Sequence, residues 1–249
     1  FPYFDFSASA KVYYEQGFDL LFIVERAHLD SEGKYITFGL KERYDFLEWI
    51  KFVDKRHGGR ARILLAGVSM GASTVMYTLG LDLPKSVKGA LCDCGFDTPK
   101  HVIGFALIEV FKSKKLASFM SNFVSFAALF KIGSLLGRVN TSKSLKKNTL
   151  PVMFAHGKAD DVVPFEMFEK NISCNPSEMF TVTSEKAAHG LVFYYENEEY
   201  LKTFQKLIEA AEDPLILGSQ LGSFGQLVAV DGQVHHDEAA GVPDLVGEV

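Results

Sequence analysis

Several residue types are scarce in this chain of 249 residues. It has three cysteines, too few for a disulfide framework, and Cys92 and Cys94 are one residue apart, so we expect reduced, buried thiols. The longest uncharged apolar run, at 116–130, has 15 residues, whereas a membrane-spanning helix needs roughly 20. An excess of basic residues is also missing, since the formal net charge is -5, which argues against a nucleic-acid-binding domain.

Apolar and aromatic residues are abundant. The chain is 47% hydrophobic and 23% charged and contains 22 Phe and 9 Tyr, which excludes a disordered chain and favours one globular domain. Residues 212–249 differ, with seven acidic residues, six glycines and no Lys or Arg, so residues 1–211 carry +2 and the remainder -7. We therefore predict a domain at 1–211 and an acidic, glycine-containing extension at 212–249, irregular or loosely docked.

The chain begins with FPYFDF and not with methionine. We expect the start of the gene product to be missing, together with any signal or anchor that it carries. A cytoplasmic location is favoured on the residues present, and the oligomeric state stays open.

Apolar runs of strand length alternate with helical patterns along the chain. The expected strands are 18–24, 61–67, 87–92, 151–157 and 178–184, and the expected helices are 38–56, 72–79, 164–171 and 199–211. Continuous apolar runs are typical of strands that are covered on both faces. The alternation therefore predicts an α/β protein with a mostly parallel sheet flanked by helices.

Residues 101–136 interrupt this alternation, because they contain no strand pattern. One helical face there collects large apolar residues, namely Leu116, Phe119, Met120, Phe123, Phe126, Ala127 and Phe130. We interpret about 100–148 as a helical lid inserted between two strands; an ordinary core helix is the alternative. A basic loop that begins near Arg138 follows, and we expect it to be solvated.

The pentapeptide Gly67-Val68-Ser69-Met70-Gly71 follows an expected strand and opens an expected helix. This context is the one that a nucleophilic serine on a sharp strand-to-helix turn requires. The glycines on either side leave room for neighbouring backbone, and the Met70 amide at the helix N-terminus is a candidate oxyanion donor. A glycine-rich turn whose serine only caps the helix is the alternative.

A serine nucleophile needs a base and an orienting carboxylate. Asp160 follows the strand 151–157 and is the first choice for the acid, with the adjacent Asp161 as the alternative. His189 follows the strand 178–184, at the same expected edge of the sheet, and is the best candidate for the base. No pair of residues has convincing zinc-ligand spacing, so we expect no metal, and no cofactor is implied.

These strings resemble the α/β-hydrolases, in particular small bacterial serine hydrolases of the esterase and acyl-peptidase-like branch. The matching segments are ERAHLDSEGKYITFG (25–39), GVSMGAST (67–74), DCGF (93–96), HGKADDVVPF (156–165) and AAHG (187–190). The resemblance implies the α/β-hydrolase fold and a catalytic triad of Ser69, Asp160 and His189, with the Met70 amide in the oxyanion hole.

Two departures from the family pattern stand out. The segment that reads approximately Arg-Gly-His-Gly in relatives is Arg26-Ala27-His28-Leu29 here, which alters a glycine-dependent turn. Relatives also carry an earlier strand with a His-Gly loop that supplies a second oxyanion amide, and nothing before Phe18 resembles it. N-terminal strands are therefore expected to be missing from this chain.

The expected activity is hydrolysis of carboxylic esters through an acyl-enzyme on Ser69. The expected substrate is a small ester with an apolar acyl or aryl group, because the insertion is rich in Phe. Thioester and peptide substrates use the same triad and stay open. A non-catalytic binding or scaffold protein on a hydrolase fold is the alternative from another functional class, favoured by the two departures.

Overall fold

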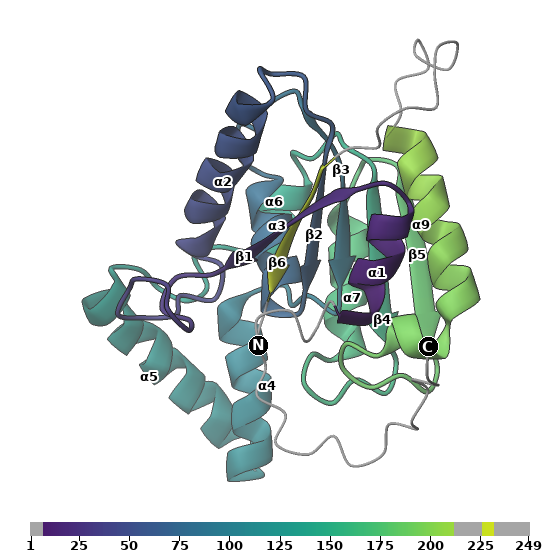
Figure 1. Cartoon of the computed structure of the whole chain (residues 1–249). Coiled ribbons are helices and arrows are strands. Elements are labelled where there is room, and N and C mark those ends of the chain that lie inside the picture. The colour runs from purple at the N-terminus through teal and green to yellow at the C-terminus, as the bar shows by residue number, and fades with distance from the viewer. Residues whose placement is uncertain (1–6, 212–225, 232–249) are drawn as a thin grey trace.

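The computed structural model describes residues 7–211 and 226–231. Helices and strands alternate along most of this part of the chain (Figure 1). The helices are α1 Ser7–Glu15, α2 Glu42–Arg56, α3 Met70–Thr78, α4 Pro99–Phe111, α5 Lys114–Ile132, α6 Thr141–Leu145, α7 Phe165–Cys174, α8 Val192–Tyr195 and α9 Asn197–Ala211. The strands are β1 Asp19–Val24, β2 Ile63–Val68, β3 Val87–Asp93, β4 Val152–Gly157, β5 Met179–Ser184 and β6 Gln226–Asp231.

The six strands form one sheet in the order β1-β6-β2-β3-β4-β5, and every pair is parallel. The five strands expected from apolar runs all form, within a residue or two of the expected bounds. The predicted parallel sheet with flanking helices is therefore confirmed. Because all strands run the same way, their carboxyl ends meet at one edge, the lower one in Figure 1.

Strand β6 comes from the acidic extension. It lies between β1 and β2, with Val228 opposite Leu21 on one side and Leu65 on the other. The expectation of an irregular or loosely docked extension is thus wrong for residues 226–231. The short apolar run Leu227 to Val230, which is followed by Asp231 and Gly232, was the available signal. The boundary between a domain at 1–211 and an extension at 212–249 stays a prediction.

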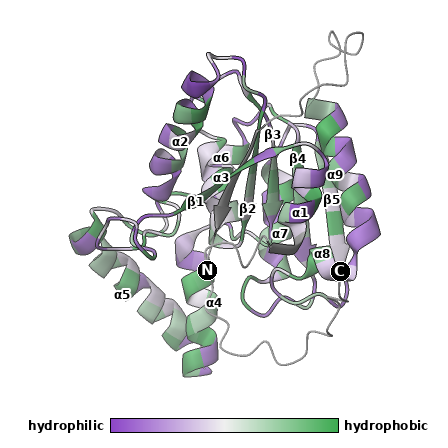
Figure 2. Ribbon diagram, in the orientation of Figure 1, coloured by the Kyte–Doolittle hydropathy of each residue, from purple (hydrophilic) through white to green (hydrophobic). Residues whose placement is uncertain are grey.

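Two apolar layers cover the sheet. Alternate β2 residues face opposite sides, so Ile63 and Leu65 pack with α2, α3 and α7, whereas Leu64 and Ala66 pack with α1 and α9. The two helical layers are visible on either side of the strands in Figure 1. Hydrophobic and hydrophilic residues alternate along α2 and α9, as expected for helices with one buried face (Figure 2).

The insertion between β3 and β4 forms helices that pack on each other and lie below the carboxyl ends of the strands (Figure 1). Lys112, with a left-handed φ of 49°, ends α4, and α5 begins two residues later. Most of the large apolar side chains of α5, including four Phe, are exposed, whereas Ser121, Ser125 and Ile132 are buried. The alternative of an ordinary core helix therefore does not describe α5.

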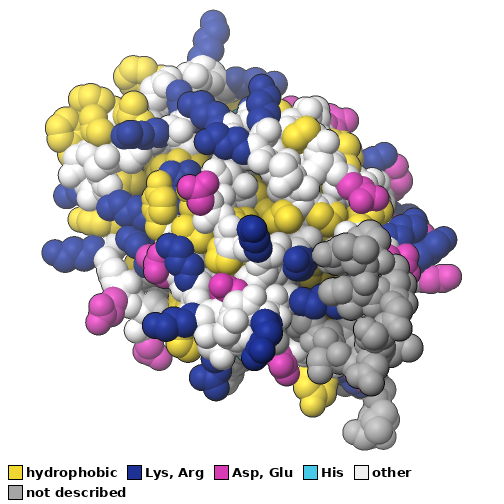
Figure 3. All heavy atoms as spheres, turned by 90° about the horizontal axis from the view of Figure 1, so that it is seen from above, with side chains coloured by type: hydrophobic (Ala, Val, Ile, Leu, Met, Phe, Trp, Pro, Cys, Tyr) yellow, Lys and Arg dark blue, Asp and Glu magenta, His cyan; other side chains and the backbone are white. Residues whose placement is uncertain are grey.

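One face of the described part of the chain carries many basic side chains. Lys and Arg side chains lie over much of the face seen from above, with hydrophobic side chains between them (Figure 3). Within the described residues, no helix combines the length and the hydropathy that a membrane span requires. Cys92 and Cys94 are buried and free, as expected.

Candidate active site

Ser69 lies on the turn that joins β2 to α3. Its φ of 53° and ψ of -116° lie in a region that non-glycine residues rarely adopt, so the turn stores strain. A Cβ atom at Gly67 would come within 2.4 Å of the Gly71 backbone, which means that only glycine allows the strand and the helix to approach this closely. The local sequence therefore dictates both the sharp turn and the position of the hydroxyl at the carboxyl edge.

Three side chains from separate loops meet at this edge. His189 Nε2 lies 2.8 Å from Ser69 Oγ, and His189 Nδ1 lies 2.7 Å from Asp160 Oδ2. All three side chains are buried, with at most 8% of any of the three residues exposed. The structure thus brings together the serine, base and acid that were predicted from residues up to 120 positions apart.

The carboxylate of Asp160 is held by several donors. Its Oδ1 accepts hydrogen bonds from the amides of Val162 and Val163 at 2.9 and 2.8 Å, and its Oδ2 lies 3.3 Å from His156 Nε2. Burial by itself would raise the pKa of Asp160, but hydrogen bonds from His156 and His189 and from the Val163 amide lower it below its usual range. The carboxylate therefore stays ionised beside the imidazole.

The alternative acid, Asp161, and the histidines His28, His57 and His101 do not join this group. Asp161 is exposed, and His28 and His101 contact the Arg26 carbonyl and the Asp97 carboxylate instead of Ser69. His57 ends α2. His235 and His236 lie outside the described residues.

Met70 is the first residue of α3 and is buried. Amides in the first turn of a helix have no acceptor within the helix, and the helix dipole places partial positive charge there. The Met70 amide is therefore available to an oxyanion that forms beside Ser69. Its place at the helix N-terminus is consistent with the role of an oxyanion donor.

The altered turn at Arg26 to Leu29 keeps an unusual backbone. Ala27 and Leu29 have left-handed φ angles of 60° and 45°, the region that favours glycine. Arg26 makes a two-pronged ion pair with Asp45 of α2, at 2.5 and 2.6 Å, which holds the loop against that helix. The glycine-type turn therefore persists without glycine, at a cost of about 1 kcal/mol or more for each residue.

Sequence reasoning expected Cys94 to be buried but missed its contact with His189, and it missed the buried Asp93, although the string DCGF contains both residues. Cys94 Sγ lies 3.8 Å from His189 Nε2, and burial, aided by Asp93 and Asp160, raises the pKa of this thiol well above its ordinary value. Burial also raises the pKa of Asp93 to about 6. Both residues lie near Ser69 because β3, which ends at Asp93, pairs with β2, which leads into the serine turn.

Cys94, Asp160 and His189 also form a group of potential metal ligands, with donor atoms within 4.8 Å of one another. Both imidazole nitrogens already contact the other site residues, because Nδ1 faces Asp160 and Nε2 faces Ser69. A metal in this group would have to displace these contacts and the thiol proton. The arrangement fits proton transfer between Ser69 and His189 better than metal ligation.

Comparisons with known proteins agree with this architecture. No protein-family model matches the chain. YqkD, an uncharacterized protein of Bacillus subtilis (strain 168), is 22% identical over 202 residues, which cover 81% of this chain and 66% of that protein. The esterase Pf2001 of Pyrococcus furiosus has a TM-score of 0.53 at 19% identity, over 74% of this chain and 66% of that chain. In another crystal form of Pf2001 the TM-score is 0.51 at 22% identity.

The chain thus spans just under two thirds of the length of YqkD and of the first Pf2001 structure. At these identities the likeness concerns the fold. The chain has the α/β-hydrolase fold, with a parallel sheet flanked by helices.

Proposed function

We propose that this protein is a serine hydrolase that cleaves carboxylic esters through an acyl-enzyme intermediate on Ser69. One observation carries the proposal, namely the continuous chain of contacts from Ser69 Oγ through both nitrogens of His189 to Asp160, at 2.8 and 2.7 Å. A serine that only caps a helix needs neither a left-handed φ nor a buried imidazole and carboxylate behind it. Both features support a nucleophile.

The reaction would follow the sequence of proton transfers that this chain of contacts allows. Ser69 Oγ attacks the ester carbonyl while His189 Nε2 takes its proton, and Asp160 stabilises the resulting imidazolium at Nδ1. The same Nε2 proton then goes to the leaving alkoxide, which departs as the alcohol. A water molecule repeats the cycle on the acyl-enzyme and releases the acid.

The Met70 amide would stabilise the tetrahedral oxyanion. Met70 is the first residue of α3 and follows Ser69 directly, so its amide belongs to the helix N-terminus, where the helix dipole places partial positive charge. One such donor contributes about 100 to 1000 fold in rate.

We infer an apolar acyl or aryl group in the substrate from the apolar residues next to Ser69. Met70, Phe96 and Val163 belong to one apolar cluster that adjoins the serine, and Phe38 packs against Phe96 with its ring centre 6.5 Å away. The insertion joins this cluster through Ile132, Leu136 and Val139, which supports its role as a lid over the site. The outward Phe side chains of α5 do not contribute to it.

The test is covalent labelling of the purified full chain with a fluorophosphonate, followed by intact mass and peptide mapping. We expect one adduct on Ser69, turnover of p-nitrophenyl butyrate, and loss of both in Ser69→Ala. The matched control is Ser173→Ala, which removes an exposed hydroxyl of α7. Unchanged turnover in Ser69→Ala would overturn the proposal, and a folded chain that takes no label would indicate a binding protein instead. Thioester and amide substrates of the same acyl group then rank the three bond types.

A further inference from the structure

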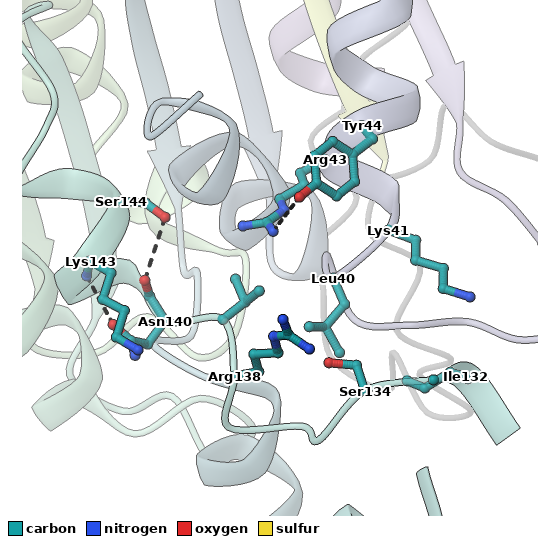
Figure 4. Close-up of a pocket in the computed structure, with 12 residues that line it drawn as sticks. Leu40, Lys41, Arg43, Tyr44, Ile132, Ser134, Arg138, Asn140, Lys143 and Ser144 are labelled. Atoms are coloured by element: carbon teal, nitrogen blue, oxygen red, sulfur yellow. Dashed lines mark hydrogen bonds between the residues drawn. The ribbon is translucent and has the colours of Figure 1, made fainter. Parts of the chain in front are cut away.

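A pocket of about 320 Å³ lies between the start of α2 and the loop that joins α5 to α6 (Figure 4). Its lining contains four basic side chains and no acidic one; the basic residues are Lys41, Arg43, Arg138 and Lys143. No residue of the proposed catalytic machinery lines it. The pocket is therefore positively charged and distinct from the proposed triad, although Leu40, Ile132 and Val139 in its lining belong to the apolar cluster that contains Met70.

The cations of this pocket have no acidic partners within residues 7–211 and 226–231. No ion pair joins any of the four to a described carboxylate. Arg43 donates to the Tyr44 hydroxyl at 2.7 Å, but its Nε is buried and has no hydrogen-bond acceptor among the described residues. The guanidinium groups of Arg43 and Arg138 both point into the space between them in Figure 4. This arrangement favours an oxyanion ligand such as phosphate.

Helix α5 ends at this pocket. Its large apolar side chains are mostly exposed and its small polar ones are buried, which is the reverse of the usual arrangement in a surface helix. Its outward stripe carries Phe119, Phe123, Phe126 and Phe130, which are 56–73% exposed. Its inward stripe carries small side chains, and the hydroxyls of Ser121 and Ser125 bond to the Lys100 carbonyl and the Leu136 amide. Hydrophobic colour accordingly extends along much of this projecting helix (Figure 2). An exposed apolar stripe of this kind marks an interaction surface.

The apolar stripe ends beside the pocket, at the C-terminal end of α5, although Ile132 is buried on another face of the helix than the exposed Phe130. Ile132, Gly133 and Ser134 at the end of α5 line the pocket, and Phe130 lies within one turn of them. The whole insertion, residues 99–147, is strongly basic, with nine Lys or Arg and a single acidic residue, Glu109. Positive charge therefore lies at both ends of the apolar stripe, on Lys114 and Lys115 before it and on Lys131 after it, whereas residues 116–130 are uncharged.

We propose that the outward stripe of α5 and the adjoining cationic pocket form a docking surface for membranes that contain anionic phospholipids. The Phe side chains would enter the boundary between headgroups and acyl chains, as on an interfacial amphipathic helix, and the pocket would hold a headgroup phosphate. A second copy of this chain is a poorer occupant, since the +8 charge of the insertion would face an equal charge. The proposal is independent of the chemistry at Ser69.

Vesicle flotation of the full chain tests this surface. One set of vesicles contains phosphatidylcholine alone, and the other contains in addition about one third phosphatidylglycerol. We expect flotation with the anionic vesicles only, weakened at high salt. The double variant Phe123→Ser/Phe130→Ser should abolish it, and Arg43→Gln and Arg138→Gln should each weaken it about fivefold, the usual effect of one basic residue near an anionic surface.

The matched control is Phe52→Ser, which removes an exposed Phe from α2 and should bind as the parent does. Equal binding to both kinds of vesicle, or binding to neither, would overturn the proposal. So would light scattering that shows a dimer which the double Phe variant dissociates, because the stripe would then cover a second copy. Titration with inorganic phosphate distinguishes free phosphate from a lipid headgroup as the ligand of the pocket. Phosphate binding without flotation would identify a small-anion site and refute membrane docking.

Discussion

Asp93 offers a quantitative test of the structure that does not depend on the proposed reaction. It ends β3, is 3% exposed, and its Oδ1 has no hydrogen-bond partner among the described residues. Burial raises the pKa of Asp93 from 3.8 to about 6; His156 and His189 oppose this rise, and Asp160 adds to it. The folded state therefore disfavours the ionised carboxylate.

The pH dependence follows from this raised pKa. Below about pH 4 the carboxyl is protonated in both the folded and the unfolded chain, so it causes no loss of stability. As the pH rises toward 6 the unfolded chain ionises first, and stability falls by about 1.4 kcal/mol for each pH unit. Above pH 6 the loss is complete, at about 3 kcal/mol. In Asp93→Asn the amide side chain has nearly the same shape as the carboxyl group and does not titrate.

The assay is urea unfolding of the parent and of Asp93→Asn between about pH 4 and pH 8. The difference in unfolding free energy should shift in favour of the variant by about 3 kcal/mol across this range, or by roughly 6–12 °C in Tm. Comparing the two pH values cancels the constant effect of the amide on packing. Asp161→Asn is the control, because its carboxylate is exposed to water, and its difference should stay constant. A constant difference for Asp93→Asn as well would refute the reasoning.

Three further changes test the site and the sheet. Asp160→Asn should lower kcat for p-nitrophenyl butyrate by about 10⁴ fold, because the amide cannot hold the imidazolium, whereas Asp161→Asn should leave kcat nearly unchanged. Gly67→Ala should destabilise the protein by about 3 kcal/mol or prevent folding, because its Cβ would lie 2.4 Å from the α3 backbone. Gly137→Ala is the control: its Cβ would make only ordinary contacts, so thermal unfolding should show little change. Val228→Pro should cost about 3 kcal/mol in urea unfolding, because it removes a ladder hydrogen bond from a central strand, whereas Val228→Thr keeps the amide and should cost less.

For each of these three pairs of variants, one result would contradict the expectation. Equal kcat losses in the two Asp variants would remove Asp160 from its proposed role. Normal stability of Gly67→Ala would mean that β2 and α3 do not approach as described. If Val228→Pro unfolds like the parent, β6 is not a central strand.

The sequence predicted the sheet well because its signal is local. Strands such as β2 and β4 are covered on both faces, so each of them appears as a continuous apolar run of strand length. Ser69 was recognisable for the same reason, since a sharp turn between strand and helix needs glycines at fixed offsets from the serine.

Helix α5 and strand β6 show the limit of such signals. The periodicity of α5 revealed one apolar face, but whether that face packs inward depends on what the neighbouring elements present, and here Ser121 and Ser125 pack inward instead. The apolar run of β6 is short, and its partners β1 and β2 lie more than 150 residues away along the chain, so nothing in the local pattern indicated where it would pair.

The sequence by itself determined the alternation of strands and helices, the strained serine turn, and the loops that would supply an acid and a base, because each of these depends on neighbours in the chain. Only the tertiary structure decided that Asp160, and not Asp161, faces His189, that Asp93 is buried, and that the Cys94 thiol lies next to His189. It alone turned the Phe stripe of α5 outward and set β6 inside the sheet. The physical reason is that adjacent residues point in different directions, and contacts between distant segments select which of them is buried.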